Sequence, residues 1–463
     1  MSGRAWAMLF VLCGALFLDA LDVSMKGVAL PAINADLGLS AGSLQWVVSG
    51  YVLGFGGFLL LGGRVADLLG RRRVFLASLG AFLVASSAGG LATADELLVA
   101  ARFLTGVSAA FIAPAGLSII TTSFAEGPAR NKALSIYSAT GASGFSLGLV
   151  VGGLLTELSW RWVFFAPVLM SAVTLAGAVW LVPDRGRPRG PRRGFDIAGA
   201  LAVTSAMLLL VFTLVEAPTA GWASFRTVGS LVGTGLLLVL FVVIERRSPA
   251  PLVRLGLLRS AATIRANVGA MALLGGWVGC LFIITLYLQQ VRGWSALETG
   301  LAVCPSGIVV ALLAPRVAAP LVGRLGAPAV ILAGLTAAAL AYVLLRSLDQ
   351  ASGYAAVMLP AFLLVGLAFT LAYGPLTILA TNGIPPEEQG VAGGLVNTSF
   401  QLGPALALAA VTAVTAANTP ANTGTGSTAL LDGFHAGLLV PLAASLIGIV
   451  VIATGLARPV RAS

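Results

Sequence analysis

The chain has 463 residues, of which 58% are hydrophobic and only 10% are charged, and its formal net charge is +10. A soluble domain carries about 25% charged residues, and a globule of this size leaves too much of its surface in water to tolerate so apolar a composition. The composition therefore excludes a soluble protein and predicts a chain that lies in the lipid bilayer.

Fourteen apolar segments follow one another along the chain, and each approaches the length of about 20 residues that a membrane-spanning helix needs. Only helices and closed barrels satisfy every backbone group in lipid, and the continuous hydrophobicity of these segments excludes the alternating strands of a barrel. We therefore predict an all-α membrane protein. The predicted helices are 7–31, 45–63, 74–92, 97–121, 134–156, 163–182, 197–215, 228–244, 266–290, 299–319, 327–345, 354–380, 390–416 and 434–456.

The loops between these helices differ strongly in positive charge. Loops rich in Lys and Arg stay on the cytoplasmic side, so we predict that both termini are cytoplasmic and interpret the net charge as a topology signal, with no nucleic acid as partner. The outer residues are Arg161, Arg226, Arg292 and Arg346. The inner residues are Arg4, Arg64, Arg71, Arg72, Arg73, Arg130, Lys132, Arg185, Arg187, Arg189, Arg192, Arg193, Arg246, Arg247, Arg254, Arg259, Arg316, Arg324, Arg458 and Arg461.

The first predicted helix carries charged side chains where lipid tolerates few. Asp19, Asp22 and Lys26 are spaced three and four residues apart, so they share one helical face. A charge at the bilayer centre costs about 2.5–3.5 kcal/mol, so these residues must face a cavity or a partner. The fourth predicted helix offers Arg102 at a depth compatible with Asp22. The group is either a protonatable carboxylate beside a fixed positive charge or a static set of salt bridges that holds helices together.

A second candidate site follows the second predicted helix. Gly63 and Gly70 permit a tight turn and close packing. Asp67, between them, can cap a helix or bind a nearby arginine. The basic residues that follow are Arg71, Arg72 and Arg73.

The fifth predicted helix carries glycines at a spacing of four residues. Gly144, Gly148 and Gly152 lie on one face, and Gly153 follows directly. A partner helix can approach such a face closely. The spacing by itself predicts a close packing surface.

The sequence indicates no other chemistry. Cys13, Cys280 and Cys304 lie far apart in apolar segments without metal-ligand spacing, so we expect neither a disulfide framework nor a metal site. No P-loop pattern is present, so we do not expect ATP to drive the protein directly. Since no nucleophile–base arrangement appears, we predict that the chain is not an enzyme and needs no cofactor.

Together these segments resemble the major facilitator superfamily. Residues 63–73 resemble its inner loop motif, G-x-x-x-D-[RK]-x-G-[RK]-[RK], with Leu68 at a usually basic position. Residues 21–31 resemble the first-helix motif of its drug:proton antiporters, L-D-x-T-x-x-N-x-A-L-P. Residues 144–153 resemble the antiporter motif G-x-x-x-G-P-x-x-G-G, with Leu149 in place of proline.

Three further segments extend the resemblance along the chain. Residues 102–106 resemble the fourth-helix motif R-x-x-Q-G, with Thr105 where glutamine is usual. Residues 160–164 and 287–290 are typical of the fourteen-helix branch. The chain is therefore similar to a fourteen-helix drug:proton antiporter.

The resemblance implies a major facilitator fold in which fourteen helices form two six-helix bundles plus a central hairpin. The N-terminal bundle would comprise residues 1–182, the basic linker and hairpin 183–262, and the C-terminal bundle 263–463. Substrate would bind near the midplane between the bundles, and rocking would expose it alternately. We expect a monomer in the bacterial inner membrane.

The resemblance also implies proton-driven export of small, largely hydrophobic compounds such as antibiotics. Asp22 would exchange the proton, Arg102 would adjust its ionisation, the inner loop motif would stabilise one facing state, and the glycine face would seal the outer side. The side chains expected to line the substrate cavity are Gln289, Gln290, Asn397 and Gln401.

Two alternatives remain open. The chain could transport one specific metabolite in either direction, or it could be a receptor or assembly factor that uses a transporter fold without transport. The charges of Asp19, Asp22, Lys26 and Arg102 sum to zero. We therefore expect neutral or acidic compounds to be preferred over lipophilic cations.

Overall fold

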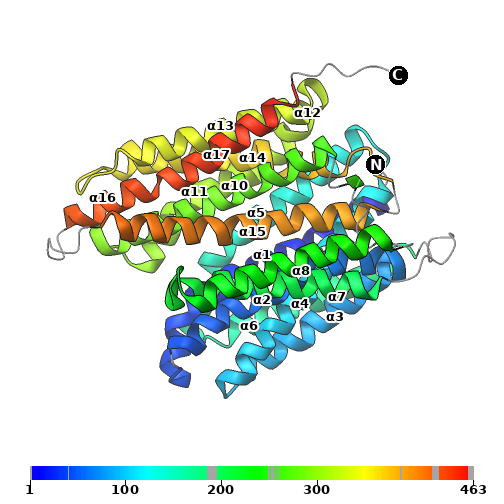
Figure 1. The fold of residues 1–463 in the computed structure, drawn as a ribbon, viewed down its shortest axis with the longest axis horizontal. Helices are drawn as coiled ribbons and strands as arrows, with labels where there is room; N and C mark the ends of the chain where they lie inside the picture. Colours follow the sequence, from blue (N-terminus) through cyan, green and yellow to red (C-terminus); the bar gives the residue numbers. More distant parts are fainter. Residues whose placement is uncertain are drawn as a thin grey trace. The chain divides into compact units, whose positions relative to one another are not determined.

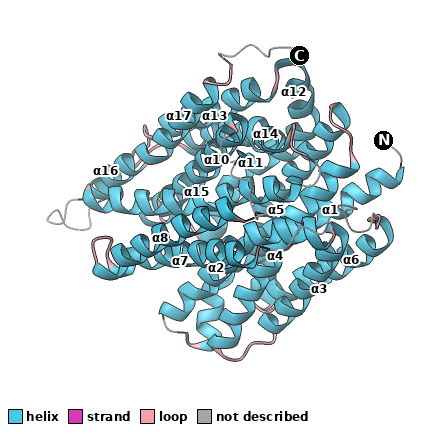
Figure 2. Ribbon diagram, turned by 45° about the vertical axis from the view of Figure 1, so that its right-hand side comes forward, coloured by secondary structure: helices cyan, strands magenta, loops and turns pink. Residues whose placement is uncertain are grey.

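The computed structural model describes residues 3–39, 41–184, 196–248, 251, 256–257, 260–385, 388–419 and 427–456. Most of the predicted basic linker, residues 185–195, lies outside the described residues, as do Arg254, Arg259, Arg458 and Arg461. Within the described ranges the secondary structure is helical and contains no strand, as Figure 2 shows. The prediction of an all-α protein is confirmed.

The helices follow the predicted apolar segments in order (Figure 1). In the described residues, fourteen helices are long and apolar enough to cross a membrane, and each overlaps one predicted segment. The elements are α1 (Gly3–Leu37), α2 (Ala41–Leu69), α3 (Arg71–Gly90), α4 (Asp95–Ser123), α5 (Pro128–Leu158), α6 (Trp162–Leu181), α7 (Ile197–Ala220), α8 (Phe225–Arg247), α10 (Ala261–Leu286), η1 (Tyr287–Val291), α11 (Ala296–Leu313), η2 (Ala314–Ala318), α12 (Ala319–Leu325), α13 (Ala327–Leu345), η3 (Tyr354–Met358), α14 (Leu359–Thr381), α15 (Gln389–Ala417), α16 (Ser427–Gly437) and α17 (Leu439–Ala453).

Some predicted spans are built from more than one element. The span Leu297–Leu325 comprises α11, the π-helical turn η2 and α12. Pro315 lies in η2 and has no backbone N–H to donate. A local π turn accommodates the missing hydrogen bond without ending the helix. Hydropathy alone could not show this, since it measures only whether a segment is apolar.

The chain divides into two compact units. Unit 1 contains residues 1–260 and 381–398, and unit 2 contains residues 261–380 and 399–463. The helix α15 therefore begins in unit 1 and ends in unit 2. The predicted division into an N-terminal bundle, a hairpin and a C-terminal bundle remains a prediction.

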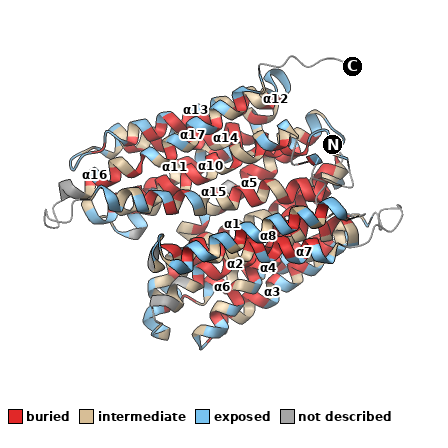
Figure 3. Cartoon of the chain, in the orientation of Figure 1, coloured by how far each residue is buried: buried red, intermediate tan, exposed pale blue. Residues whose placement is uncertain are grey.

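Unit 1 is built on close pairing of α2 with α4 and of α1 with α5. The α7–α8 hairpin packs against α2, where Trp46 stacks on Phe212 with ring centroids 5.7 Å apart. The opposite face of α8 is apolar and exposed, with Leu236 and Val239 each more than 60% accessible (Figure 3). A helix that exposes apolar side chains in this way is suited to lipid contact. The hairpin thus adds an apolar outer surface to unit 1.

Unit 2 packs α17 against α10 and α13. At one end, the hydroxyl of Tyr287 donates to the carbonyl of Asp349 at 2.7 Å, and Arg292 donates to the carbonyl of Ser352 at 2.5 Å. Ser352 in turn donates its hydroxyl to the carboxylate of Asp349, which lowers the pKa of this exposed loop residue. These bonds fix the short turn between α13 and η3.

Candidate functional site

The charged face of α1 meets α4 inside unit 1. The ammonium of Lys26 donates to Oδ1 of Asp22, and Nη1 of Arg102 donates to Oδ2 of Asp22 at 2.7 Å. The exposed fractions of Asp22, Lys26 and Arg102 are 0%, 1% and 2%. The structure therefore brings together three charges from two predicted helices, and one carboxylate binds both cations.

Aromatic rings surround this buried ion cluster. The guanidinium of Arg102 lies 4.8 Å from the ring centroid of Tyr51, and its Nε donates to the carbonyl of Val47 at 3.0 Å. The ammonium of Lys26 lies 4.6 Å from the ring centroid of Phe164 on α6. Aromatic faces attract desolvated cations. The rings thus compensate part of the hydration that Lys26 and Arg102 lose.

Asp19 joins the cluster through Tyr51. The hydroxyl of Tyr51 donates to the carboxylate of Asp19, which is only partly buried. Tyr51 therefore connects Asp19 to Arg102, since its hydroxyl contacts the first and its ring the second. Tyr51 could not be predicted from the sequence, because helical spacing identifies the residues that share a face but not the side chain on the facing helix. We name Asp19, Asp22, Lys26, Tyr51 and Arg102 the charge cluster.

The glycines of α5 pack directly on α1. A side chain at Gly144 would place its Cβ 2.7 Å from the carbonyl oxygen of Phe17, and one at Gly152 would lie 2.8 Å from Cα of Met25. Gly148 is equally crowded by α1, whereas Gly153 has nearly open space around it. Three of the four glycines thus make the close approach of α1 and α5 possible. The charged face of α1 points away from α5, toward α2 and α4.

The inner loop motif binds the beginning of α15. The buried carboxylate of Asp67 accepts hydrogen bonds from Arg71, with Nη2 at 3.1 Å, and from the backbone N–H of Val391 at 3.3 Å. Backbone N–H groups in the first turn of a helix have no partner within that helix. Asp67 therefore caps α15. Gly63 lies against the backbone of Gly390, where no side chain would fit.

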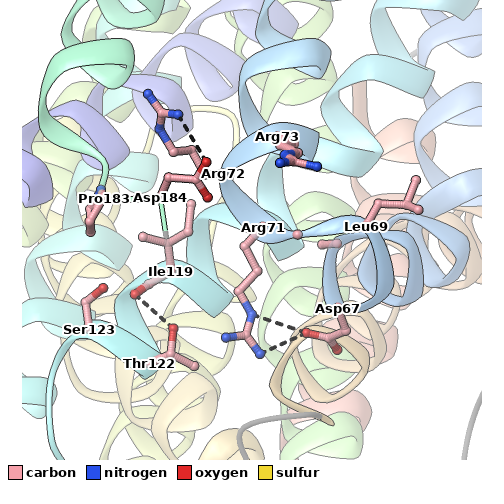
Figure 4. Close-up of a pocket in the computed structure, with 12 residues that line it drawn as sticks. Asp67, Leu69, Arg71, Arg72, Arg73, Ile119, Thr122, Ser123, Pro183 and Asp184 are labelled. Carbon is pink, nitrogen blue, oxygen red and sulfur yellow. Dashed lines mark hydrogen bonds and ion pairs between the residues drawn. The ribbon is translucent and has the colours of Figure 1, made fainter. Parts of the chain in front are cut away.

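The arginines of this motif have different environments, as Figure 4 shows. Nη2 of Arg72 donates to the carbonyl of Val179 at 2.8 Å, and its Nη1 lies 3.8 Å from the carboxylate of Asp184. Arg73 is exposed. Gly70 has a φ of 102°, a conformation that suits glycine and allows the sharp turn between α2 and α3. The motif, the end of α4 and residues 183–184 line a cavity of about 60 Å³.

A second network binds the same segment to the rest of unit 1. Nη2 of the buried Arg130 donates to the carbonyl of Thr381 and to Oε1 of Gln389, each at 3.2 Å. Its Nη1 donates to Glu126 at 3.0 Å, and Nε2 of Gln389 donates to the carbonyl of Ile384 at 2.6 Å. From the sequence, Arg130 was predicted only as an inner basic residue, because Thr381 and Gln389 lie about 250 residues away in the chain.

The residues expected to line a substrate cavity make fewer side-chain contacts than those of the charge cluster. Gln289 and Gln290 are exposed on η1. Asn397 donates to the carbonyl of Gly393 in its own helix at 2.8 Å, and Gln401 is partly buried. In unit 2, Ser399 donates to Asn267 at 2.6 Å, a polar pair that the sequence did not suggest. The role of the four predicted residues in substrate binding remains a prediction.

Comparison with known proteins identifies relatives along nearly the whole chain. Puromycin resistance protein pur8 of Streptomyces alboniger is 37% identical over 450 residues, which cover 95% of this chain and 88% of that protein. Cephamycin export protein CmcT of Amycolatopsis lactamdurans is 37% identical over 455 residues, which cover 97% and 92%.

A solved structure is similar in fold. The human organic anion transporter MFSD10 matches with a TM-score of 0.67 and 14% identity, over 98% of this chain and 100% of that one. The sequence also matches the Major Facilitator Superfamily over residues 12–408. Since this match covers most of the chain and both relatives are similar over nearly their whole length, the protein belongs to the Major Facilitator Superfamily.

Proposed function

We propose that this protein is a secondary active transporter that exports small, largely hydrophobic compounds, such as antibiotics, in exchange for protons. The observation that carries the proposal is the buried charge cluster within membrane-spanning helices. Ionisable groups in the membrane are costly and mark ion or substrate pathways. The names of the two relatives, a puromycin resistance protein and a cephamycin export protein, support antibiotics as the substrate class.

The proposed coupling uses the charge cluster as the proton site and the inner loop motif as a latch. Asp67 and Arg130 bind the first turn of α15 and the residues before it, so one facing state would be stabilised while these contacts exist. Loss of the contacts would accompany the other facing state. The energy comes from the proton gradient, so we expect neither a cofactor nor enzymatic activity.

We further propose a monomer in the bacterial inner membrane with both termini in the cytoplasm. The uneven distribution of arginine between the loops supports this orientation. The balanced charge of Asp19, Asp22, Lys26 and Arg102 supports a preference for neutral or acidic substrates over lipophilic cations.

Uptake of puromycin into everted membrane vesicles tests the proposed function. Vesicles that contain the protein and are acidified inside should accumulate puromycin, and a protonophore should abolish the accumulation. Vesicles without the protein provide the control. Accumulation that survives the protonophore would contradict proton coupling. Absence of uptake for puromycin and for a panel of unrelated antibiotics would favour a transporter of one metabolite.

A further inference from the structure

We propose that Asp19, rather than Asp22, exchanges the proton, and that Asp22 is the permanent counter-charge of Arg102 and Lys26. This inference rests on the proposed proton-coupled transport and names the residue within the charge cluster that carries the proton. Its basis is the difference between the partners of the two carboxylates, which lie one helical turn apart on α1.

Both oxygens of Asp22 are occupied by cations. Oδ1 accepts from Lys26 and Oδ2 accepts from Arg102 at 2.7 Å, and all three side chains are at least 98% buried. A proton on Asp22 would leave two cations buried near each other without a counter-charge. Removing one partner of a buried ion pair is strongly unfavourable. A residue that must gain and lose a proton in every cycle is poorly placed here.

Asp19 has a neutral hydrogen-bond partner, and its side chain is more exposed than that of Asp22. Its carboxylate accepts from the hydroxyl of Tyr51, and its side chain is partly exposed, whereas that of Asp22 is fully buried. A hydroxyl can donate to an ionised carboxylate and accept from a protonated one. Asp19 can therefore change its charge while both ion pairs of Asp22 remain intact.

The other helices against α1 add no further charge near Asp19 in the described part of unit 1. Besides Asp22 and Lys26 on its own helix, the ionisable groups are Tyr51 on α2 and Arg102 on α4. The face of α5 toward α1 presents glycine, with Gly144 beside the carbonyl of Phe17. The face of α6 presents an aromatic ring to Lys26 and a threonine hydroxyl near Gly14.

Arg102 is linked to both carboxylates, directly to Asp22 and through Tyr51 to Asp19. Its guanidinium pairs with Asp22 and covers the ring of Tyr51, whose hydroxyl binds Asp19. A change in the charge of Asp19 would therefore reach Arg102 through Tyr51 without breaking the ion pair with Asp22. Tyr51 acts as a positioning residue in this scheme.

Infrared difference spectroscopy during a pH step tests the assignment without a substrate. The carbonyl stretch of a protonated carboxylic acid should appear when the purified wild-type protein is acidified. Each of the 17 acidic side chains can contribute to this band, so the contribution of Asp19 is found by comparing variants. Asp19→Asn should remove one component of the wild-type band, whereas Asp22→Asn combined with Lys26→Met should retain that component. Asp36→Asn is the matched control, because Asp36 lies on the same helix and pairs with Arg161 away from the cluster.

A second variant changes no charge. Tyr51→Phe should move the pH midpoint of the Asp19 band upward by about one unit, the scale of one hydrogen bond to a carboxylate, because the ionised form loses its donor. A band in Asp19→Asn identical to that of the wild type, or an unchanged midpoint in Tyr51→Phe, would overturn the assignment. Failure of the wild-type vesicles to accumulate either puromycin or any antibiotic of the panel in response to the gradient would instead count against the proposed function, so the two failures are distinguishable.

Discussion

Asp22 is the counter-charge of the buried cations inside unit 1. It supplies the carboxylate for two buried cations that come from different helices, Lys26 on α1 and Arg102 on α4. In water each of these groups would be solvated at no structural cost. Inside a membrane-spanning bundle, each cation needs a counter-charge, so the cluster joins α1 to α4 as well as serving transport.

We therefore expect Asp22→Asn to destabilise the protein by about 3–5 kcal/mol, the cost of leaving buried cations without their partner. Adding Lys26→Met removes one of the two orphaned cations and should recover part of this loss. The thermal unfolding midpoint of the purified protein measures both effects, with Asp36→Asn as the control on the same helix. An unchanged midpoint in Asp22→Asn would show that the cluster contributes little to stability.

At the scale of helices, α1 is held between a seam of glycines and a layer of polar side chains. The glycines of α5 allow its backbone to approach α1 closely, and the opposite face of α1 then meets Tyr51 and Arg102. The distance between α1 and α5 thus affects how deeply the charge cluster is buried.

The glycine seam offers a matched pair of substitutions. In Gly148→Ala the new Cβ would lie 2.8 Å from the carbonyl of Leu21 and would also clash with Ser24, whereas in Gly153→Ala the nearest atom is Val28 Cγ1 at 4.0 Å. We expect Gly148→Ala to cost about 1–3 kcal/mol by overpacking. Gly153→Ala should be neutral or slightly stabilising, because alanine favours a helix more than glycine does. Equal unfolding midpoints for the two variants would contradict a close α1–α5 contact.

The helices were predictable to a greater extent than the contacts between them. Continuous hydrophobicity identified every span, because lipid selects for it directly. The partner of a buried polar group depends on which helices become neighbours, and no local pattern encodes this. Spacing could therefore place Asp19 and Asp22 on one face, but it could not identify Tyr51, and it gave no sign that Arg130 would bind Gln389.

At the scale of the whole molecule, the loops expected on one side of the membrane gather at one end of unit 1. The α2–α3 turn, the end of α4 and the residues after α6 surround the same cavity. At another set of helix ends, Arg161 binds Asp36 at 2.7 Å and the carbonyl of Ala92 at 3.5 Å, which joins loops predicted to lie outside. Successive loops of unit 1 therefore lie at alternate ends of the unit, as expected of a chain that crosses the membrane repeatedly.

Single cysteines test the proposed orientation of the whole chain. In a protein without Cys13, Cys280 and Cys304, a membrane-impermeant maleimide added to intact cells should label cysteines placed at Phe225 and Asp349, which lie in predicted outer loops. It should not label cysteines at Arg73 and Arg324 until the membrane is opened, because positive charge holds their loops in the cytoplasm. The two pairs test units 1 and 2 separately. Labelling of residues 73 and 225 from the same side would require an even number of spans between them in place of the five helices α3 to α7. A reversed pattern in the second pair alone would place the error between residues 225 and 324.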